Sequence, residues 1–154
     1  MPALYDNDIE GSADAVSSLT LAGFVVANNA NRGMVVGVAS FDGTAANSLP
    51  NAVTFNGSGV GWAQVITELG PGANLDRATI WEKINPDAVT ADVVVTFPAV
   101  CAEVRVNALS ASGANQTDLT GASEVSAEGT TEGTATVTVA LSANGDLCYD
   151  TAYI

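Results

Sequence analysis

The sequence contains no histidine, and this absence excludes several kinds of active site. Without imidazole there is no Ser-His-Asp triad, no Cys-His pair and no histidine metal ligand, and the side chain best suited to moving protons near neutral pH is missing. We therefore expect a protein that is not an enzyme, with no catalytic residues, no cofactor and no bound metal.

Positive charge is almost as scarce as histidine. Four Lys and Arg residues stand against 17 Asp and Glu residues, which gives a net charge of -13 over 154 residues. Nucleic acids require a basic surface that replaces the counterions of their phosphates, and anionic membranes attract basic segments. The charge balance therefore argues against both as partners.

Charged residues of either sign make up only 14% of the chain, against about 25% in an average domain. Hydrophobic residues make up 47%, which is enough for a folded core and argues against intrinsic disorder. No apolar run approaches the ~18 residues of a membrane span. Residues 1–14 carry neither the basic residues nor the apolar run of a secretory signal, so we expect no leader.

Only two cysteines are present, Cys101 and Cys148, and each lies in a segment with the pattern of a strand. Two small buried thiols and one disulfide are both compatible with this spacing, since a bridge requires Cα atoms within about 7 Å. A catalytic thiol is not expected, because no neighbouring base would activate it.

Periodicity favours strands almost everywhere, because branched residues dominate the apolar segments and Gly, Asn or Pro interrupts them at short intervals. The sequence predicts nine strands, at residues 19–27, 33–41, 52–55, 62–69, 78–84, 92–97, 102–108, 135–141 and 147–154. Asn56-Gly57 and Asn85-Pro86 predict turns. The fold class is therefore all-β, an antiparallel β-sandwich of the immunoglobulin-like or jelly-roll kind.

The first 18 residues have few apolar side chains, and they predict an extended N-terminal arm that precedes a sandwich domain at residues 19–154. Such a segment cannot offset its own ordering entropy, at about 1–2 kcal/mol per residue, so it is expected to order against a partner. Leu4, Tyr5 and Ile9 are the expected assembly contacts, since they can bury apolar area there. Residues 117–133 predict an exposed acidic loop.

Several other residues are weaker candidates for sites. Residues 6–11 match the start of a calcium loop, but Ser17 stands where the bidentate Glu belongs, so a solvated acidic segment is favoured. Three strand carboxylates could in principle serve glycoside hydrolysis, yet exposed strand positions are the preferred interpretation. Two tryptophans could stack on a sugar, although core packing is favoured. These side chains are Glu68, Glu82, Glu103, Trp62 and Trp81.

An ordered series of motifs resembles a β-sandwich module of phage structural proteins and bacterial surface proteins. The series comprises NRGMVVGVASFDG at residues 31–43, AVTFNGSGV at 52–60, TIWEKINPDAVTADVVVTF at 79–97, ALSASGANQTDL at 108–119 and TATVTVALSANGDLCYD at 134–150. This resemblance implies a sandwich fold and no catalytic residues. Modules of this kind usually continue after the last motif, and a sandwich short of strands would need a neighbour to cover its edge.

These observations together predict a structural protein of a phage virion. The leading hypothesis is a capsid decoration or cement subunit that docks on the major capsid protein or other virion proteins, self-associates as a homo-oligomer, and lies on the capsid surface. The alternatives are an extracellular carbohydrate-binding or adhesion module, which would use Trp62 or Trp81, and a filament subunit that donates its N-terminal arm as a strand.

Overall fold

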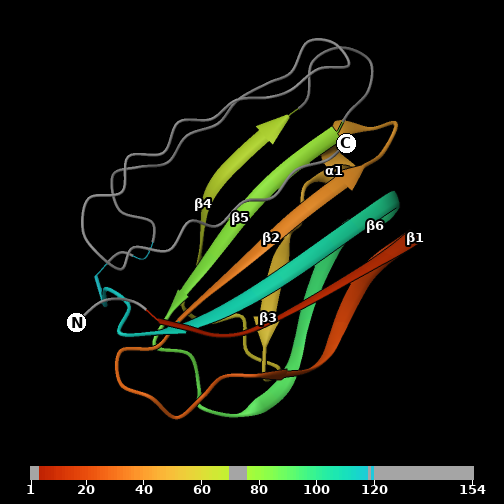
Figure 1. Ribbon diagram of the computed structural model, residues 1–154. Coiled ribbons are helices and arrows are strands. Elements are labelled where there is room, and N and C mark those ends of the chain that lie inside the picture. Colours follow the sequence, from red (N-terminus) through yellow and green to blue (C-terminus); the bar gives the residue numbers. More distant parts are fainter. Residues whose placement is uncertain (1–3, 70–75, 118, 120–154) are drawn as a thin grey trace.

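The computed structural model describes residues 4–69, 76–117 and 119. Its strands all pair antiparallel, in the order β1-β6-β2-β5-β4 with β3 also on β6, which confirms the predicted all-β fold (Figure 1). The elements are β1 (Leu4–Val25), β2 (Gly33–Phe41), α1 (Ala45–Ser48), β3 (Ala52–Phe55), β4 (Trp62–Leu69), β5 (Asp76–Ile84) and β6 (Thr90–Ser112).

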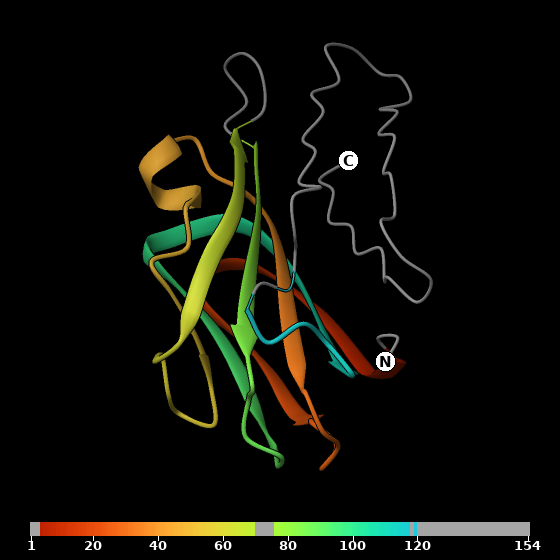
Figure 2. The same ribbon diagram turned by 90° about the vertical axis from the view of Figure 1, so that its left-hand side faces the viewer.

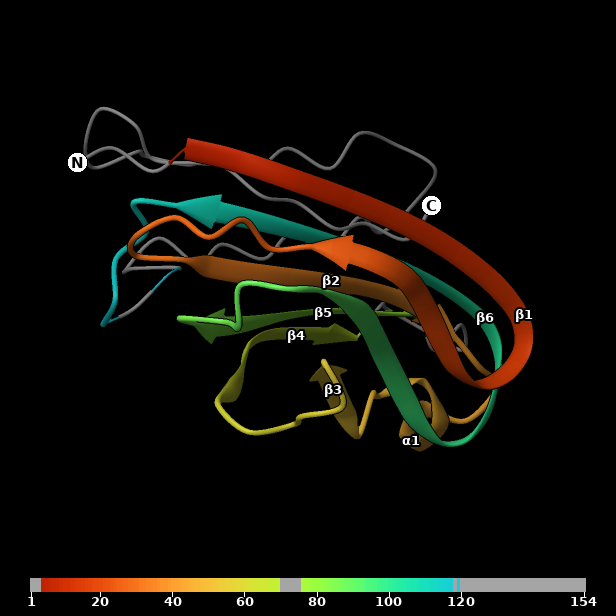
Figure 3. The same cartoon turned by 90° about the horizontal axis from the view of Figure 1, so that it is seen from below.

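Two long bent strands turn this one sheet into a sandwich. β1 and β6 pair from Leu4 opposite Ser112 to Val25 opposite Thr90, and both bend sharply midway (Figure 3). The second half of β6 also pairs with β2, whereas its first half pairs with β3. The large layer therefore contains the start of β1, the end of β6, β2, β5 and β4. The small layer contains the end of β1, the start of β6, and β3.

The corner between the layers has a simple cause in each strand. In β6, Pro98 lies within residues 97–100, which have no ladder partner among the described strands, so its missing N–H costs no ladder hydrogen bond there. In β1, the register shifts between Val16 and Ser18, and Ala15 has a φ of 53°. The sequence predicts one strand on each side of Pro98, whereas the structure shows a single strand that turns a corner there.

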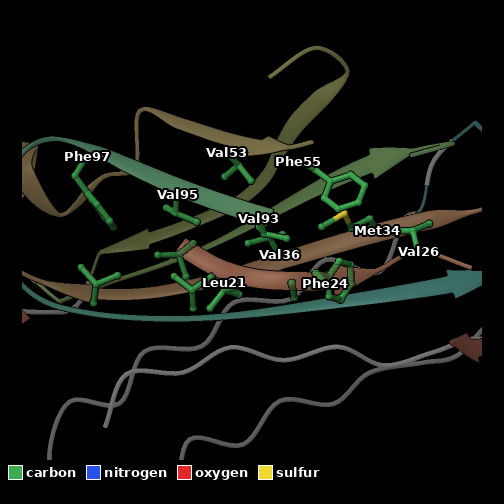
Figure 4. Packing of buried hydrophobic residues seen from close by; sticks show 14 of the residues in the cluster. Leu21, Phe24, Val26, Met34, Val36, Val53, Phe55, Val93, Val95 and Phe97 are labelled. Atoms are coloured by element: carbon green, nitrogen blue, oxygen red, sulfur yellow. The ribbon is translucent and has the colours of Figure 1, made fainter. Parts of the chain in front are cut away.

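The core fills the space between the two layers. Alternate residues of β2 point inward, and they meet the inward residues of β3 and of the first half of β6 (Figure 4). Phe24 and Phe55 meet edge to face with ring centroids 6.1 Å apart. The fully buried members include Met34, Val36, Val38, Val53, Val93 and Val95. The four-residue α1 lies beyond this core, at the end where β5 begins (Figure 2).

The N-terminal segment differs from the expected arm. β1 crosses residue 18 without interruption, and residues 4–16 form part of the large layer through pairing with β6. The inward positions of this half hold Ile9, Gly11 and Ala13, and an ideal Cβ on Gly11 would lie 2.7 Å from Leu21 Cδ2. The segment has few apolar groups because its inward positions are small and closely packed. A strand available for donation to a neighbour is therefore not what the structure shows.

The two predicted turns are confirmed by backbone geometry. Asn56 and Gly57 have φ values of 52° and 71°, the pattern of a type I′ turn, and Phe55 and Ser58 exchange backbone hydrogen bonds across it. Asn85 has a φ of 49°, and its N–H donates to the carbonyl of Arg32 at 2.9 Å. The predicted strands at 135–141 and 147–154, and nearly all of the predicted loop at 117–133, lie outside the described residues.

The close approach of Gly11 to Leu21 gives a test of this arrangement. Gly11→Val should lower the free energy of unfolding by about 1–3 kcal/mol, because the added carbons must displace a side chain in a packed core. Chemical denaturation measures the change. Gly43→Ala is the control, since a Cβ there meets nothing within 4 Å. An unchanged stability of Gly11→Val would show that this half of β1 does not pack on Leu21.

Candidate assembly surface

The three predicted contact residues all lie in the first stretch of β1, but their surroundings differ. Leu4 and Tyr5 pair opposite Ser112 and Ala111 and expose 56% and 53% of their surface. Ile9 is only partly buried, and it packs against the protein's own core. Two of the three are thus free to contact another molecule, while Ile9 is largely committed to the fold.

The start of β1 is held by hydrogen bonds to distant parts of the chain. Asp6 Oδ1 accepts from Asn29 Nδ2 at 3.3 Å and from Ser112 Oγ at 3.1 Å. Asn7 Nδ2 donates to the carbonyl of Val25 at 3.4 Å. These contacts surround a β-bulge between Tyr5 and Asn7. The exposed apolar pair is therefore presented by an anchored segment.

Beyond the bulge, β1 has a regular stretch from Asn7 to Asp14. Among the described residues, β1 pairs only with β6, so its other edge has no strand partner there. The exposed side chains of this stretch include Asp8, Glu10 and Asp14. We call residues 7–14 the β1 edge. A second bulge, between Val16 and Ser18, follows shortly after it.

The partial calcium loop is part of this same strand. Residues 6–11 are extended and paired with β6, so successive side chains point to opposite faces of the sheet. Alternate residues share a face but lie about 7 Å apart along the strand, whereas a chelating loop curls so that its oxygens converge on one ion. Among the residues that the structure describes, no group of three or more acidic or cysteine side chains has an arrangement suited to a metal ion.

The strand glutamates do not form a glycosidase pair. Glu82 is buried and Glu103 is partly buried, so the exposed positions expected for these two are wrong. Glu82 is opposite Val35, and Glu103 is opposite Phe41, six residues further along β2. At ~3.4 Å per residue this separates them by about 20 Å, whereas glycosidases hold their two carboxyl groups roughly 5–9.5 Å apart. The backbone of Glu68 is opposite Ala78, about 14 Å along β5 from Glu82 by the same measure.

Both tryptophans lie at the margin of the core. Trp62 is opposite Lys83, and Trp81 is opposite Gln64, so both indoles are on the inward face of the β4-β5 pair. Each is partly buried and packs against the core cluster. Lys83 Nζ lies 5.9 Å from the centroid of the Trp62 ring, and Trp81 Nε1 donates to Thr79 Oγ1 at 3.3 Å. These contacts favour core packing over a sugar platform.

Cys101 is a free, buried thiol at the corner of β6. Its Sγ lies 3.1 Å from the carbonyl oxygen of Phe41 and 3.4 Å from that of Glu103. Burial raises the pKa of this thiol above its ordinary value, and the nearby carboxylate of Asp42 raises it further. The thiolate is therefore disfavoured. Cys148, the other cysteine of the disulfide alternative, lies outside the described residues.

This environment predicts an unreactive thiol. In a Cys148→Ser background, Cys101 of the folded protein should react with a thiol reagent at least 100-fold more slowly than the same chain in denaturant, because burial limits access and the raised pKa leaves little thiolate. The rate should rise only at strongly alkaline pH. Fast labelling at neutral pH without unfolding would contradict the buried position.

The outer face of the large layer carries acidic residues at the end near the corner. Asp76 and Glu103 pair opposite the same residue, Phe41, from its two sides. Desolvation raises the pKa of Asp76, and repulsion from the carboxylate of Glu103 raises it further. Asp14 adds a third carboxylate opposite Glu103. Ionised Asp76 therefore opposes folding slightly.

The sign of this effect can be tested. A carboxyl group whose pKa is raised in the folded state adds stability below its unfolded pKa, and that stability is lost as the pH rises through the folded pKa. Asp76→Asn should therefore raise the melting temperature by about 1–2 °C at pH 7, a small effect because the side chain is still partly exposed to solvent. The difference should vanish near pH 3. A lower melting temperature of Asp76→Asn at pH 7 would mean that the ionised carboxylate stabilises the fold, contrary to this prediction.

Comparisons of the chain with protein-family models, curated proteins and solved structures found no match in any of the three. The described part of the chain also contains no helix long and apolar enough to cross a membrane. Its architecture and the exposed start of β1 are therefore the observations on which a function must be argued.

Proposed function

We propose that this chain is a non-enzymatic structural protein of a phage virion, a decoration or cement subunit on the capsid surface. The observation that carries the proposal is the exposed pair Leu4 and Tyr5, held at the start of a strand that has no second partner among the described residues. Leu4 and Tyr5 point to opposite faces of the sheet, so the end of β1 exposes apolar surface on both of its sides, and exposed apolar surface favours protein contact. The resemblance to phage structural modules supplies the class of particle.

In this proposal the subunit acts by adhesion. The end of β1 enters a groove on the major capsid protein or another virion protein, whose two walls contact Leu4 on one face and Tyr5 on the other. The sandwich stays rigid because its interior is filled by aliphatic side chains. The net charge of -13 keeps free subunits apart and soluble and steers them to a basic or mixed-charge coat surface. Contacts between copies would use other parts of the surface.

The proposal is tested on purified particles from the phage that encodes the chain. Quantitative mass spectrometry should find the chain in a fixed ratio to the major coat protein, and recombinant protein should rebind to particles stripped of it. Absence of the chain from purified particles would contradict the proposal. Presence only in the culture medium or the host cell would contradict it as well.

The contact residues can be tested in the same rebinding assay. Leu4→Ser/Tyr5→Ser should weaken rebinding roughly 30-fold, the equivalent of about 2 kcal/mol of lost apolar burial, with little change in melting temperature. Val60→Ser/Val100→Ser is a matched control, since both valines are exposed elsewhere. Equal losses in the two double variants would place the contact away from Leu4 and Tyr5.

A further inference from the structure

The β1 edge has the dimensions of a site for one short extended segment. Bulges at Tyr5/Asn7 and at Val16/Ser18 interrupt the ladder on either side of it. Between them lies a regular strand of about eight residues, Asn7 to Asp14, whose outer edge has no strand partner in the described part of the chain. A peptide that adds to an edge by main-chain hydrogen bonds needs a stretch of this kind.

The side chains of the β1 edge define what such a segment must carry. On the outer face, Asp8, Glu10 and Asp14 are exposed, with Ser12 among them. On the inner face, Ile9, Gly11 and Ala13 are apolar or small and at most partly exposed. Because side chains of neighbouring strands pair on the same face, an added strand fits best when basic residues alternate with small apolar ones.

A second copy of this chain does not fit that pattern. Pairing two β1 edges with each other would place carboxylates of one copy beside carboxylates of the other. The chain contains only four basic residues, and none precedes Arg32. Arg32, Arg77 and Lys83 donate hydrogen bonds within the protein. The fourth basic residue, Arg105, lies on β6 opposite Ser12, where it faces the carboxylates of its own β1 and is one strand away from the free edge. The complementary segment must therefore come from a different protein.

The carboxylate of Asp6 anchors the start of the β1 edge and is not one of its exposed contacts. Asp6 Oδ1 accepts two hydrogen bonds, whereas Asp6 Oδ2 is shielded from solvent and has no hydrogen-bond partner. Asp6 lies at the bulge where the β1 edge begins. An oxygen shielded in this way is not accessible to an added segment, so recognition depends on the exposed carboxylates of Asp8, Glu10 and Asp14.

We propose that the β1 edge binds an extended, basic segment of a partner protein, about eight residues long, in which Lys or Arg alternates with small apolar residues and which adds to the large layer as a further strand. This inference rests on the proposed function in one respect only, that the partner is another virion protein. The edge hydrogen bonds provide affinity, and the carboxylates select a basic segment over a neutral or acidic one.

The test uses the full chain and a defined probe. The probe is a fluorescein-labelled, end-capped peptide Lys-Val-Lys-Ala-Lys-Val-Lys-Ala, measured by anisotropy at 50 and 300 mM NaCl. One control peptide has Glu in place of each Lys. A second keeps every Lys but is N-methylated at alternate residues, which removes its main-chain donors without removing charge. The protein variants are Asp8→Asn/Glu10→Gln at the edge and Asp87→Asn/Asp92→Asn, two exposed acids elsewhere.

We expect the basic peptide to bind, and to bind at least tenfold more weakly to Asp8→Asn/Glu10→Gln. The Asp87→Asn/Asp92→Asn control should stay within twofold of the unaltered protein. The N-methylated and acidic peptides should lose at least tenfold, and binding should weaken at the higher salt concentration. The Asp92→Asn substitution keeps the side-chain oxygen that now accepts from Gly23 N–H at 3.0 Å, so the control should fold normally.

Three results would overturn the inference. Absence of binding at 1 mM peptide would show that the carboxylates only prevent the edge from pairing. Equal binding of the N-methylated peptide, or equal losses in both double variants, would reduce the effect to general charge attraction. The proposed function is tested by a different experiment, the search for this chain in purified particles. The two proposals can therefore fail independently.

Discussion

Removing residues 1–12 should lower the thermal unfolding midpoint by about 10 °C, equivalent to roughly 3–5 kcal/mol for a chain of this size. The deletion removes the strand that pairs with residues 105–112 of β6. It also removes Ile9 from the margin of the core and uncovers Leu21, against which Gly11 packs. Differential scanning calorimetry of the purified protein measures the shift.

This expected result separates two roles for the segment. If residues 1–12 were an arm that orders only against a partner, their removal would weaken assembly and leave the melting temperature nearly unchanged. The structure predicts a large loss of stability instead, so a deletion would disturb the fold and the assembly together. Leu4→Ser/Tyr5→Ser is the matched comparison, because it alters only exposed side chains. An unchanged midpoint after deletion would contradict the pairing of β1 with β6.

Most of the strand pattern could be predicted because burial and alternation coincide in it. β2, β3 and β4 begin and end where their apolar residues do, and β5 starts only two residues earlier than predicted. The sequence was less informative where a strand carries little apolar surface. In the first half of β1 the inward-facing residues are mostly small, such as Gly11 and Ala13. The strand therefore lacks the large apolar side chains at every second position by which a half-buried strand is normally recognised.

The long bent strands were not predictable from local patterns. Proline usually ends a strand, because it cannot donate a ladder hydrogen bond. β6 continues past Pro98 because this residue lies at the solvent-exposed corner between the two layers. Of the candidate site, Leu4 and Tyr5 stand out in the sequence as apolar residues in a polar segment, and the structure shows that they are exposed. Their role as assembly contacts stays a prediction. The β1 edge could not be predicted, since it depends on which strands β6 pairs with, and that is a long-range property.

Phe24→Ala and Phe55→Ala should each lower the free energy of unfolding by about 3–5 kcal/mol. Phe24 comes from β1 and Phe55 from β3, the two strands that flank β6 in the small layer. Both side chains are fully buried, and their rings meet edge to face at 83°. Each substitution leaves a cavity that the surrounding valines cannot fill without moving strands.

The contact between the two rings makes the effects of these substitutions non-additive. The double variant should cost about 0.5–1.5 kcal/mol less than the two single losses together, because the ring contact is lost only once. Urea denaturation measures the free energy of unfolding of the four proteins in this double-mutant cycle: the unaltered protein, the two single variants and the double variant. If an alanine variant does not fold, Phe24→Leu and Phe55→Leu replace the alanine substitutions. Val60→Ala at an exposed position should change stability by less than about 0.5 kcal/mol. Strictly additive losses would show that the rings do not touch, and the small layer would then have to pack differently on the large one.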